Sequence, residues 1–266
     1  MTHGENGRLR AACGLPLAAG SAVCVILCDP GDDAALWLHD TLRDLGLCRI
    51  DLVSVGQLVY STRIVHQLSD AVERGEIHLS DGRTLRPEAI RGLVNRVNFL
   101  PTRHFDNVAT ADQGYATEEL SAFFLAWLDA IPGRVINPPL PFSLNGGDFP
   151  IATVMHCAAT AGLPTGGWHA RAHESEAETS SSIEPTHVVI VFVGILFGPI
   201  LPRDLQDACR RLAILLGLPL MQVALRRLRT GEWRFMSVTG NADFRLGGSG
   251  LAAAIGRELA SSPEPA

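Results

Sequence analysis

The strongest constraint on the fold is an apolar run at residues 22–28 (AVCVILC), which ends at the turn sequence DPG at 29–31. Residues 32–45 repeat apolar side chains at helical spacing, and residues 50–55 form a second short apolar run. Strand, helix and strand in this order predict a parallel β-α-β unit, because parallel strands need a crossover connection and a helix usually supplies it. The chain is therefore expected to be an α/β protein.

The rest of the chain carries further alternating and helical patterns. A helix at 117–130 is expected to begin at Thr117, because a hydroxyl followed by Glu118 and Glu119 is typical of a helix start. The other expected elements are strands at 63–67, 76–79, 92–97 and 134–137, a helix opened by 145–148 and ended at 161, a hairpin at 187–198, a helix at 203–216, strands at 219–226 and 232–238, and a helix at 249–260.

Shifts in composition divide the chain into five predicted segments. Residues 165–185 are polar, acidic and rich in serine, so they bury too little apolar surface to fold alone and are expected to form a flexible acidic linker. The other segments are a disordered tail at 1–21, an N-terminal α/β domain at 22–140, a connecting helix at 141–164 and a C-terminal α+β half at 186–261.

The chain contains no lysine, and all 22 of its basic residues are arginines. This composition excludes a P-loop lysine, a Schiff-base lysine and a lysine general base. A formal net charge of −6 gives no electrostatic footprint for nucleic acid or for an anionic membrane. The clustered Arg226, Arg227 and Arg229 are interpreted as a solvated strand end.

Two further observations indicate a protein of the cytoplasm without a membrane segment. The most apolar run, 187–201, is shorter than a membrane span and is interrupted by Gly194, Gly198 and Pro199. The six cysteines form no CxxC pair, and several lie in apolar runs, so they are expected to be free buried thiols in a reducing compartment. No nucleic-acid or membrane partner is expected.

Several short phrases follow one another in an order that carries a family resemblance. They are Asn95-Arg96, then the long helix around Glu119, RVINPP at 134–139, NGGD at 145–148, AGLPT at 161–165, LGLPLMQVAL at 216–225, TGEW at 230–233 and SVTG at 237–240. This order resembles the ATP-grasp superfamily, close to its RimK-like carboxylate–amine ligases. The resemblance covers residues 22–165 and 187–260. It implies a Rossmann-like N-terminal (pre-ATP-grasp) domain and a truncated α+β ATP-grasp-like C-terminal half, with the 165–185 linker in place of the lid subdomain.

The chain departs from the family pattern at the positions that carry its chemistry. Where the resemblance implies a nucleotide-binding lysine, the residue is Asp148. The family's metal-binding acid corresponds to Ala224, and its magnesium-holding Glu-x-Asn pair corresponds to Ser237 and Thr239. An arginine that precedes the family's Val-Val-Gly phrase corresponds to Val189.

These departures predict a degenerate ATP-grasp protein, a pseudoenzyme with no catalytic residues, no metal site and no cofactor. Magnesium prefers carboxylate and phosphate oxygens, and acyl-phosphate chemistry needs clamped phosphates and neutralised charge. The expected function is binding or scaffolding, in a system that modifies peptides or amino acids. The expected partner is a second copy or another protein, such as an enzyme or a peptide substrate.

Two alternatives stay open at this point. One is an active carboxylate–amine ligase or ATP-binding protein, with ATP and magnesium held by unusual residues. The candidates for these unusual residues are Arg96, Asp148 and Asp243. The candidates for cofactor binding are Arg96, Asn145 and Asp148. The other is a small-ligand binding module with its site between the two halves. Arg96 is expected either to pair with Glu119 or to contact a substrate or partner, because a buried arginine needs a partner.

Overall fold

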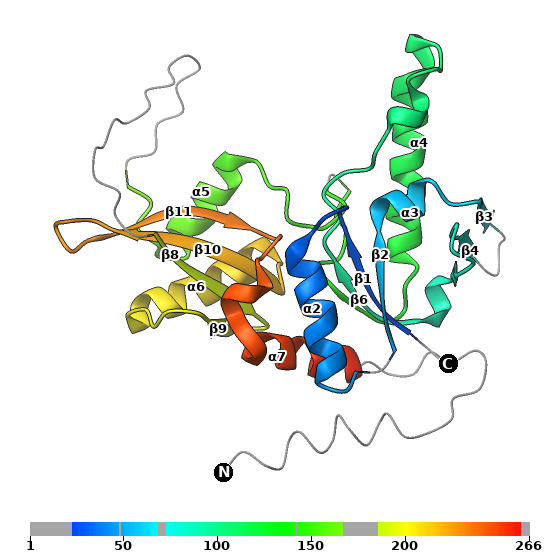
Figure 1. The fold of residues 1–266 in the computed structure, drawn as a ribbon. Coiled ribbons are helices and arrows are strands. Elements are labelled where there is room, and N and C mark those ends of the chain that lie inside the picture. The colour runs from blue at the N-terminus through cyan, green and yellow to red at the C-terminus, as the bar shows by residue number, and fades with distance from the viewer. Residues whose placement is uncertain (1–22, 48, 69–72, 142, 167–185, 262–266) are drawn as a thin grey trace. The chain divides into compact units, whose positions relative to one another are not determined.

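The computed structural model describes residues 23–47, 49–68, 73–141, 143–166 and 186–261 (Figure 1). The chain forms two compact units, one made of Met1–Gly146 with Gly248–Ala266 and the other of Gly147–Gly247. The C-terminal helix thus belongs to the first unit, whereas the sequence placed residues 186–261 in one C-terminal half. The predicted tail at 1–21 and all of the predicted linker beyond Gly166 lie outside the described residues.

The first unit contains two sheets. Its β-strands are β1 (Val23–Cys28), β2 (Ile50–Ser54), β3 (Arg63–Leu68), β4 (Glu73–His78), β5 (Thr84–Leu85), β6 (Ile90–Asn95) and β7 (Arg134–Ile136). Its helices are α2 (Asp33–Asp44), α3 (Val55–Val59), α4 (Thr110–Asp129) and α7 (Gly248–Ala260), with 3-10 turns η1 (Pro87–Ala89) and η2 (Arg103–Phe105). Strands β1, β2, β6 and β7 form a parallel sheet in the order β2-β1-β6-β7, and β3, β4 and β5 form a small antiparallel sheet.

Both faces of the parallel sheet are covered, which explains why β1 is a continuous apolar run. On one face, Val25 and Leu27 share a buried cluster with Trp127 of α4. Helices α2 and α7 contact β1 and β6 and lie side by side (Figure 1). Gly92 of β6 allows the close approach of α7, because a Cβ there would lie 2.8 Å from Leu259 Cδ2.

The second unit is an antiparallel sheet with helices on one face. Its elements are α5 (Ile151–Thr160), β8 (Thr186–Phe192), β9 (Ile195–Phe197), α6 (Arg203–Leu216), β10 (Leu220–Arg227), β11 (Trp233–Thr239) and the 3-10 turn η3 (Phe244–Gly247). The strand order is β11-β10-β8-β9. Val189, Val223 and Phe235 point toward a buried cluster that includes Ala158 of α5 and Leu212 of α6.

The observed elements confirm the expected α/β class and the parallel pairing of β1 with β2. The apolar run at 187–201 begins as the hairpin of β8 and β9, as predicted. No helix in the described part of the chain has the length and apolar composition to cross a membrane.

Two expected helix starts were wrong. Helix α4 begins at Thr110, seven residues before Thr117, and the Thr117 hydroxyl donates to the Gln113 carbonyl 2.9 Å away instead of capping a helix. Helix α5 begins at Ile151, after Pro150, and not within 145–148. Gly146 has a φ of +66°, and the Asn145 side chain is engaged elsewhere, so this stretch forms a turn.

Candidate functional site

Strands β10 and β11 bring together the three positions to which the family resemblance assigns metal ligands. Ala224 lies directly opposite Ser237 in the antiparallel ladder, and Thr239 lies opposite Gln222. Ala224 and Thr239 are half-buried and Ser237 is exposed. The cluster therefore offers one methyl group and two neutral hydroxyls where magnesium needs hard anionic oxygens.

The nearest acid in this part of the sheet is already paired. Asp243 donates its backbone N–H to Gln222 Oε1 over 2.9 Å. Its carboxylate accepts from Arg245, with Oδ1 2.8 Å from Nε and Oδ2 2.9 Å from Nη2. Asn241 N donates to the Thr239 hydroxyl over 3.1 Å. Across the described residues, no three His, Cys, Asp or Glu side chains form a group that could hold a metal ion.

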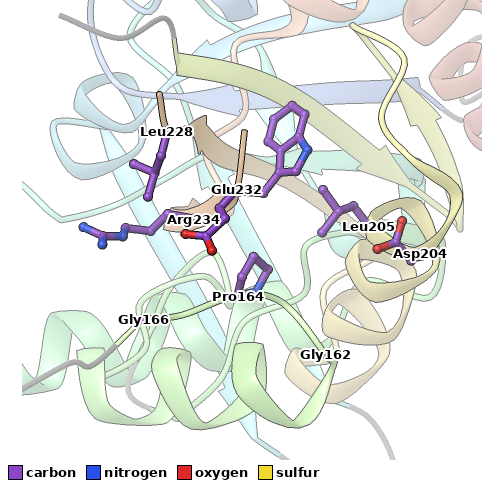
Figure 2. Close-up of a pocket in the computed structure, with 9 residues that line it drawn as sticks. Gly162, Pro164, Gly166, Asp204, Leu205, Leu228, Glu232 and Arg234 are labelled. Carbon is purple, nitrogen blue, oxygen red and sulfur yellow. The ribbon is translucent and has the colours of Figure 1, made fainter. Parts of the chain in front are cut away.

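A groove of about 490 Å³ opens at the turn end of the β10–β11 hairpin. It is lined by Gly162, Pro164, Gly166, Asp204, Leu205, Leu228, Glu232, Trp233 and Arg234 (Figure 2). The backbone beside it is held in place because Phe235 N donates to the Pro164 carbonyl over 2.7 Å. The lining combines apolar side chains with the charged Asp204, Glu232 and Arg234, which suits a ligand with both kinds of group, such as a peptide.

Trp233 is the aromatic wall of this groove. Its ring contacts His187 edge-on, with the centroids 4.9 Å apart, and the Arg227 guanidinium lies 5.9 Å from the ring centroid. Both contacts come from the helix-covered side of the sheet, where Trp233 also packs against the buried cluster. The ring is therefore fixed before any ligand arrives, which lowers the entropic cost of binding.

In the first unit, Arg96 pairs with Asp32 and not with Glu119, so the predicted partner was wrong. The guanidinium Nε lies 2.7 Å from Asp32 Oδ2, and Nη2 lies 3.0 Å from Oδ1. The side chains are only 6% and 13% exposed. The reason is topological: Asp32 follows β1 and Arg96 follows β6, and these parallel neighbours end at the same edge of the sheet. Glu119 lies exposed on α4.

Asn145 is a buried residue in a polar network of the first unit that extends to the surface at Asn98. Its Nδ2 donates to Asn98 Oδ1 over 2.8 Å, and its Oδ1 accepts from the Ser143 hydroxyl over 3.1 Å. Asn98 in turn donates to Asp29 Oδ2 over 2.8 Å. The amide of Asn145 is thus used to hold loops together at the carboxyl edge of the sheet. Asp148, the third cofactor-binding candidate, is exposed and belongs to the second unit.

A side-chain pair that the sequence analysis missed lies on the same face as Ala224. Arg226 is directly opposite Arg234 in the β10–β11 ladder. Far from being a solvated strand end, Arg226 has a buried Nε. The signal was present in the sequence, since residues 226 and 234 are equally spaced about Thr230 in the predicted turn, and that spacing pairs them in a hairpin.

Comparison with solved structures places this architecture. A RiPP-associated ATP-grasp ligase from Chryseobacterium gregarium, in complex with ADP and a leader and core peptide, matches with a TM-score of 0.66 at 8% identity, over 91% of this chain and 97% of that chain. The fold is that of ATP-grasp ligases. The macrocyclase MdnC from Microcystis aeruginosa MRC, bound with precursor peptide MdnA, matches with a TM-score of 0.64 at 11% identity, over 90% of this chain and 100% of that chain.

The ATP-grasp ligase PsnB, complexed with precursor peptide PsnA2 and AMPPNP, matches with a TM-score of 0.63 at 14% identity, over 92% of this chain and 99% of that chain. No protein-family model and no curated protein matches the sequence. At these identities the likeness establishes the fold, and function has to be argued from the residues of this chain.

Proposed function

We propose that this protein binds a peptide on an ATP-grasp fold and does not carry out ATP-dependent ligation. The observation that carries the proposal is the composition of the β10–β11 face: Ala224, Ser237 and Thr239 stand together where the family resemblance implies metal ligands. None of the three carries a negative charge, so the face has nothing to hold magnesium between protein and phosphates.

The rest of the chain does not replace the missing groups. The sequence contains no lysine to contact nucleotide phosphates, and the residue at the family's lysine position is the acid Asp148. Arg96 and Asp243, proposed above as unusual ligase residues, are engaged by Asp32 and Arg245. Phosphoryl chemistry is achieved almost entirely by positioning and charge neutralisation, so without these groups the rate advantage disappears.

A peptide is the ligand class that best fits the protein. The solved structures with the same fold include ligases bound to a leader and core peptide and to precursor peptides. The groove beside Trp233 has room for several side chains and combines apolar walls with charged ends. The protein would then act as a scaffold in peptide modification, as a homo-oligomer or beside a partner enzyme.

The decisive test is calorimetry of the native chain with ATP and Mg²⁺, accompanied by Mn²⁺ binding measured by electron paramagnetic resonance. We expect no heat of ATP binding and no bound Mn²⁺. The matched control is the triple variant Ala224→Asp, Ser237→Glu, Thr239→Asn, which restores the family's ligand types and is expected to bind Mn²⁺. Micromolar binding of Mg–ATP by the native chain would overturn the proposal and favour the ligase alternative.

A further inference from the structure

Two arginines face each other across the β10–β11 ladder. Arg226 and Arg234 are register partners, and on its other side Arg226 neighbours Thr186 of β8. Side chains at directly opposed positions have Cβ atoms about 5 Å apart, and like charges at such positions destabilise a sheet. Because residues two apart on a strand share a face, Arg226 lies on the same face as Ala224.

Neither guanidinium has a counter-ion among the residues that the structure describes. Across the described residues, no hydrogen bond or ion pair involves the side chain of Arg226 or Arg234, and Arg226 Nε is buried without an acceptor. Glu232 directly precedes β11, and its Oε2 accepts a hydrogen bond from the Thr230 hydroxyl over 3.3 Å. Figure 2 shows the Arg234 guanidinium pointing away from the Glu232 carboxylate.

An unpaired buried guanidinium N–H costs free energy, and so does the like-charge pair. The neighbouring ladder positions do not offset these costs, since the adjacent pair is Leu225 with Phe235 and the pair after it is Ala224 with Ser237, all of them neutral. The face of the β10–β11 hairpin that carries Ala224, Arg226 and Arg234, opposite the helix-covered face, therefore has a concentrated positive charge. A site of this kind is stabilised when an anion binds between the two side chains.

We propose that Arg226 and Arg234 bind the carboxylates of an acidic segment of a peptide. This inference rests on the proposed function and names the class of peptide that it takes. A guanidinium presents two parallel N–H groups that match a carboxylate, and two guanidinium groups balance two carboxylates. The two positive charges of Arg226 and Arg234 are too few to neutralise a triphosphate, because this face has no lysine and no metal ligand to add to them.

The adjoining groove adds selectivity for the rest of the peptide. Arg234 lines the groove together with the apolar Leu205, Leu228 and Trp233 (Figure 2). Asp204 and Glu232 line it as well, so the groove would take the apolar side chain of the peptide and not its carboxylates. A peptide with Asp or Glu next to a large apolar residue would satisfy both. The carboxylates fix its position and the apolar side chain adds buried area.

The test uses the full-length protein and fluorescence anisotropy with a fluorescein-labelled hexaglutamate peptide, and hexaglutamine serves as the uncharged control peptide. The variants are Arg226→Gln and Arg234→Gln. The matched control is Arg63→Gln, which removes an exposed arginine of β3 in the first unit. We expect each site variant to weaken hexaglutamate binding at least tenfold, roughly the effect of a lost charged hydrogen bond, and Arg63→Gln to leave it unchanged.

The melting temperature without peptide separates binding from a structural role. Because the substitutions relieve repulsion, we expect neither Arg226→Gln nor Arg234→Gln to lower it. The inference would be refuted if the native and variant proteins bound hexaglutamate equally well, or if the native protein bound hexaglutamine as well as hexaglutamate. It would also be refuted if the native protein did not bind hexaglutamate at all. Absence of both hexaglutamate binding and Mg–ATP binding would refute this inference but leave the proposed function intact. Displacement of hexaglutamate by Mg–ATP would overturn both.

Discussion

The buried pair Asp32–Arg96 allows a quantitative test of how the first unit is held together. The two side chains form two hydrogen bonds of 2.7 and 3.0 Å, and Asp32 Oδ1 also accepts from Ala35 N over 3.0 Å as the N-cap of α2. The carboxylate therefore joins the start of α2 to the end of β6. Removing one member leaves the other as an uncompensated buried charge.

The expected magnitudes follow from this geometry. Arg96→Met should reduce the free energy of unfolding by about 3–5 kcal/mol, because Asp32 stays buried without its partner. Asp32→Ser should cost about 3–5 kcal/mol, since serine keeps the cap but removes the carboxylate that balances the charge of the buried Arg96. The double variant Asp32→Ser, Arg96→Met removes both charges and keeps the cap, so it should lose less than about 2 kcal/mol and be more stable than either single variant.

The assay is urea unfolding followed by tryptophan fluorescence. A Trp168→Phe, Trp233→Phe background leaves Trp37 and Trp127, both in the first unit, so the signal reports that unit alone. Asp33→Ser, the adjacent acid in the first turn of α2, serves as the control for losing a carboxylate near the helix start. If the double variant loses the sum of the two single effects to within about 0.5 kcal/mol, the residues are not coupled and the reasoning is refuted.

Two further predictions concern packing and thiol chemistry. Gly92→Ala should destabilise the first unit by about 1–3 kcal/mol in the same urea assay, because the new Cβ would lie 2.8 Å from Leu259 Cδ2 of α7. The matched control is Gly114→Ala on α4, where a new Cβ would meet nothing within 4 Å. Equal losses of stability in the two variants would contradict the predicted clash. Burial raises the pKa of Cys24 and Cys209 to about 11 and that of Cys28 to about 12. A raised pKa keeps the thiol neutral, so at pH 8 on the order of one molecule in a thousand carries a thiolate at Cys24 or Cys209, and about one in ten thousand at Cys28. Iodoacetamide followed by peptide mass spectrometry should therefore modify the half-buried Cys157 before Cys24, Cys28 and Cys209. Rapid labelling of Cys28 in the folded protein would contradict this expectation.

The sequence predicted those elements whose burial is visible as a local pattern. The run at 22–28 is apolar throughout because both faces of its sheet are covered, and α6 has a single apolar stripe that ends at Gly217, in the left-handed conformation. The start of α4 was misplaced because Thr117 can bond to a carbonyl four residues earlier inside a helix as well as cap one. Residue type alone does not separate these two uses.

Pairing between distant side chains was beyond the reach of local patterns. The partner of Arg96 depends on which strands become neighbours in the parallel sheet, and this order is set by packing over the whole unit. The opposition of Arg226 and Arg234 depends on the position of a single turn, and a shift of one residue would separate them. The metal-ligand positions of the resemblance could be placed because they lie on two strands joined by that same turn.

The contrast between the two arginine sites links the neutral residues of the β10–β11 face to the proposed binding role. Arginine keeps its charge at any physiological pH, so a buried guanidinium has to be neutralised by an acid or by a ligand. Arg96 is neutralised within the protein by Asp32, which makes it part of the framework. On the β10–β11 face, carboxylates at positions 224 and 237 would stand two ladder pairs away from Arg226 and Arg234, beyond Leu225 and Phe235, and would lower the positive charge of this face. With alanine and serine there, the same residues that underlie our proposal of no magnesium binding leave a positive surface, and an acidic peptide is the ligand that we propose for it.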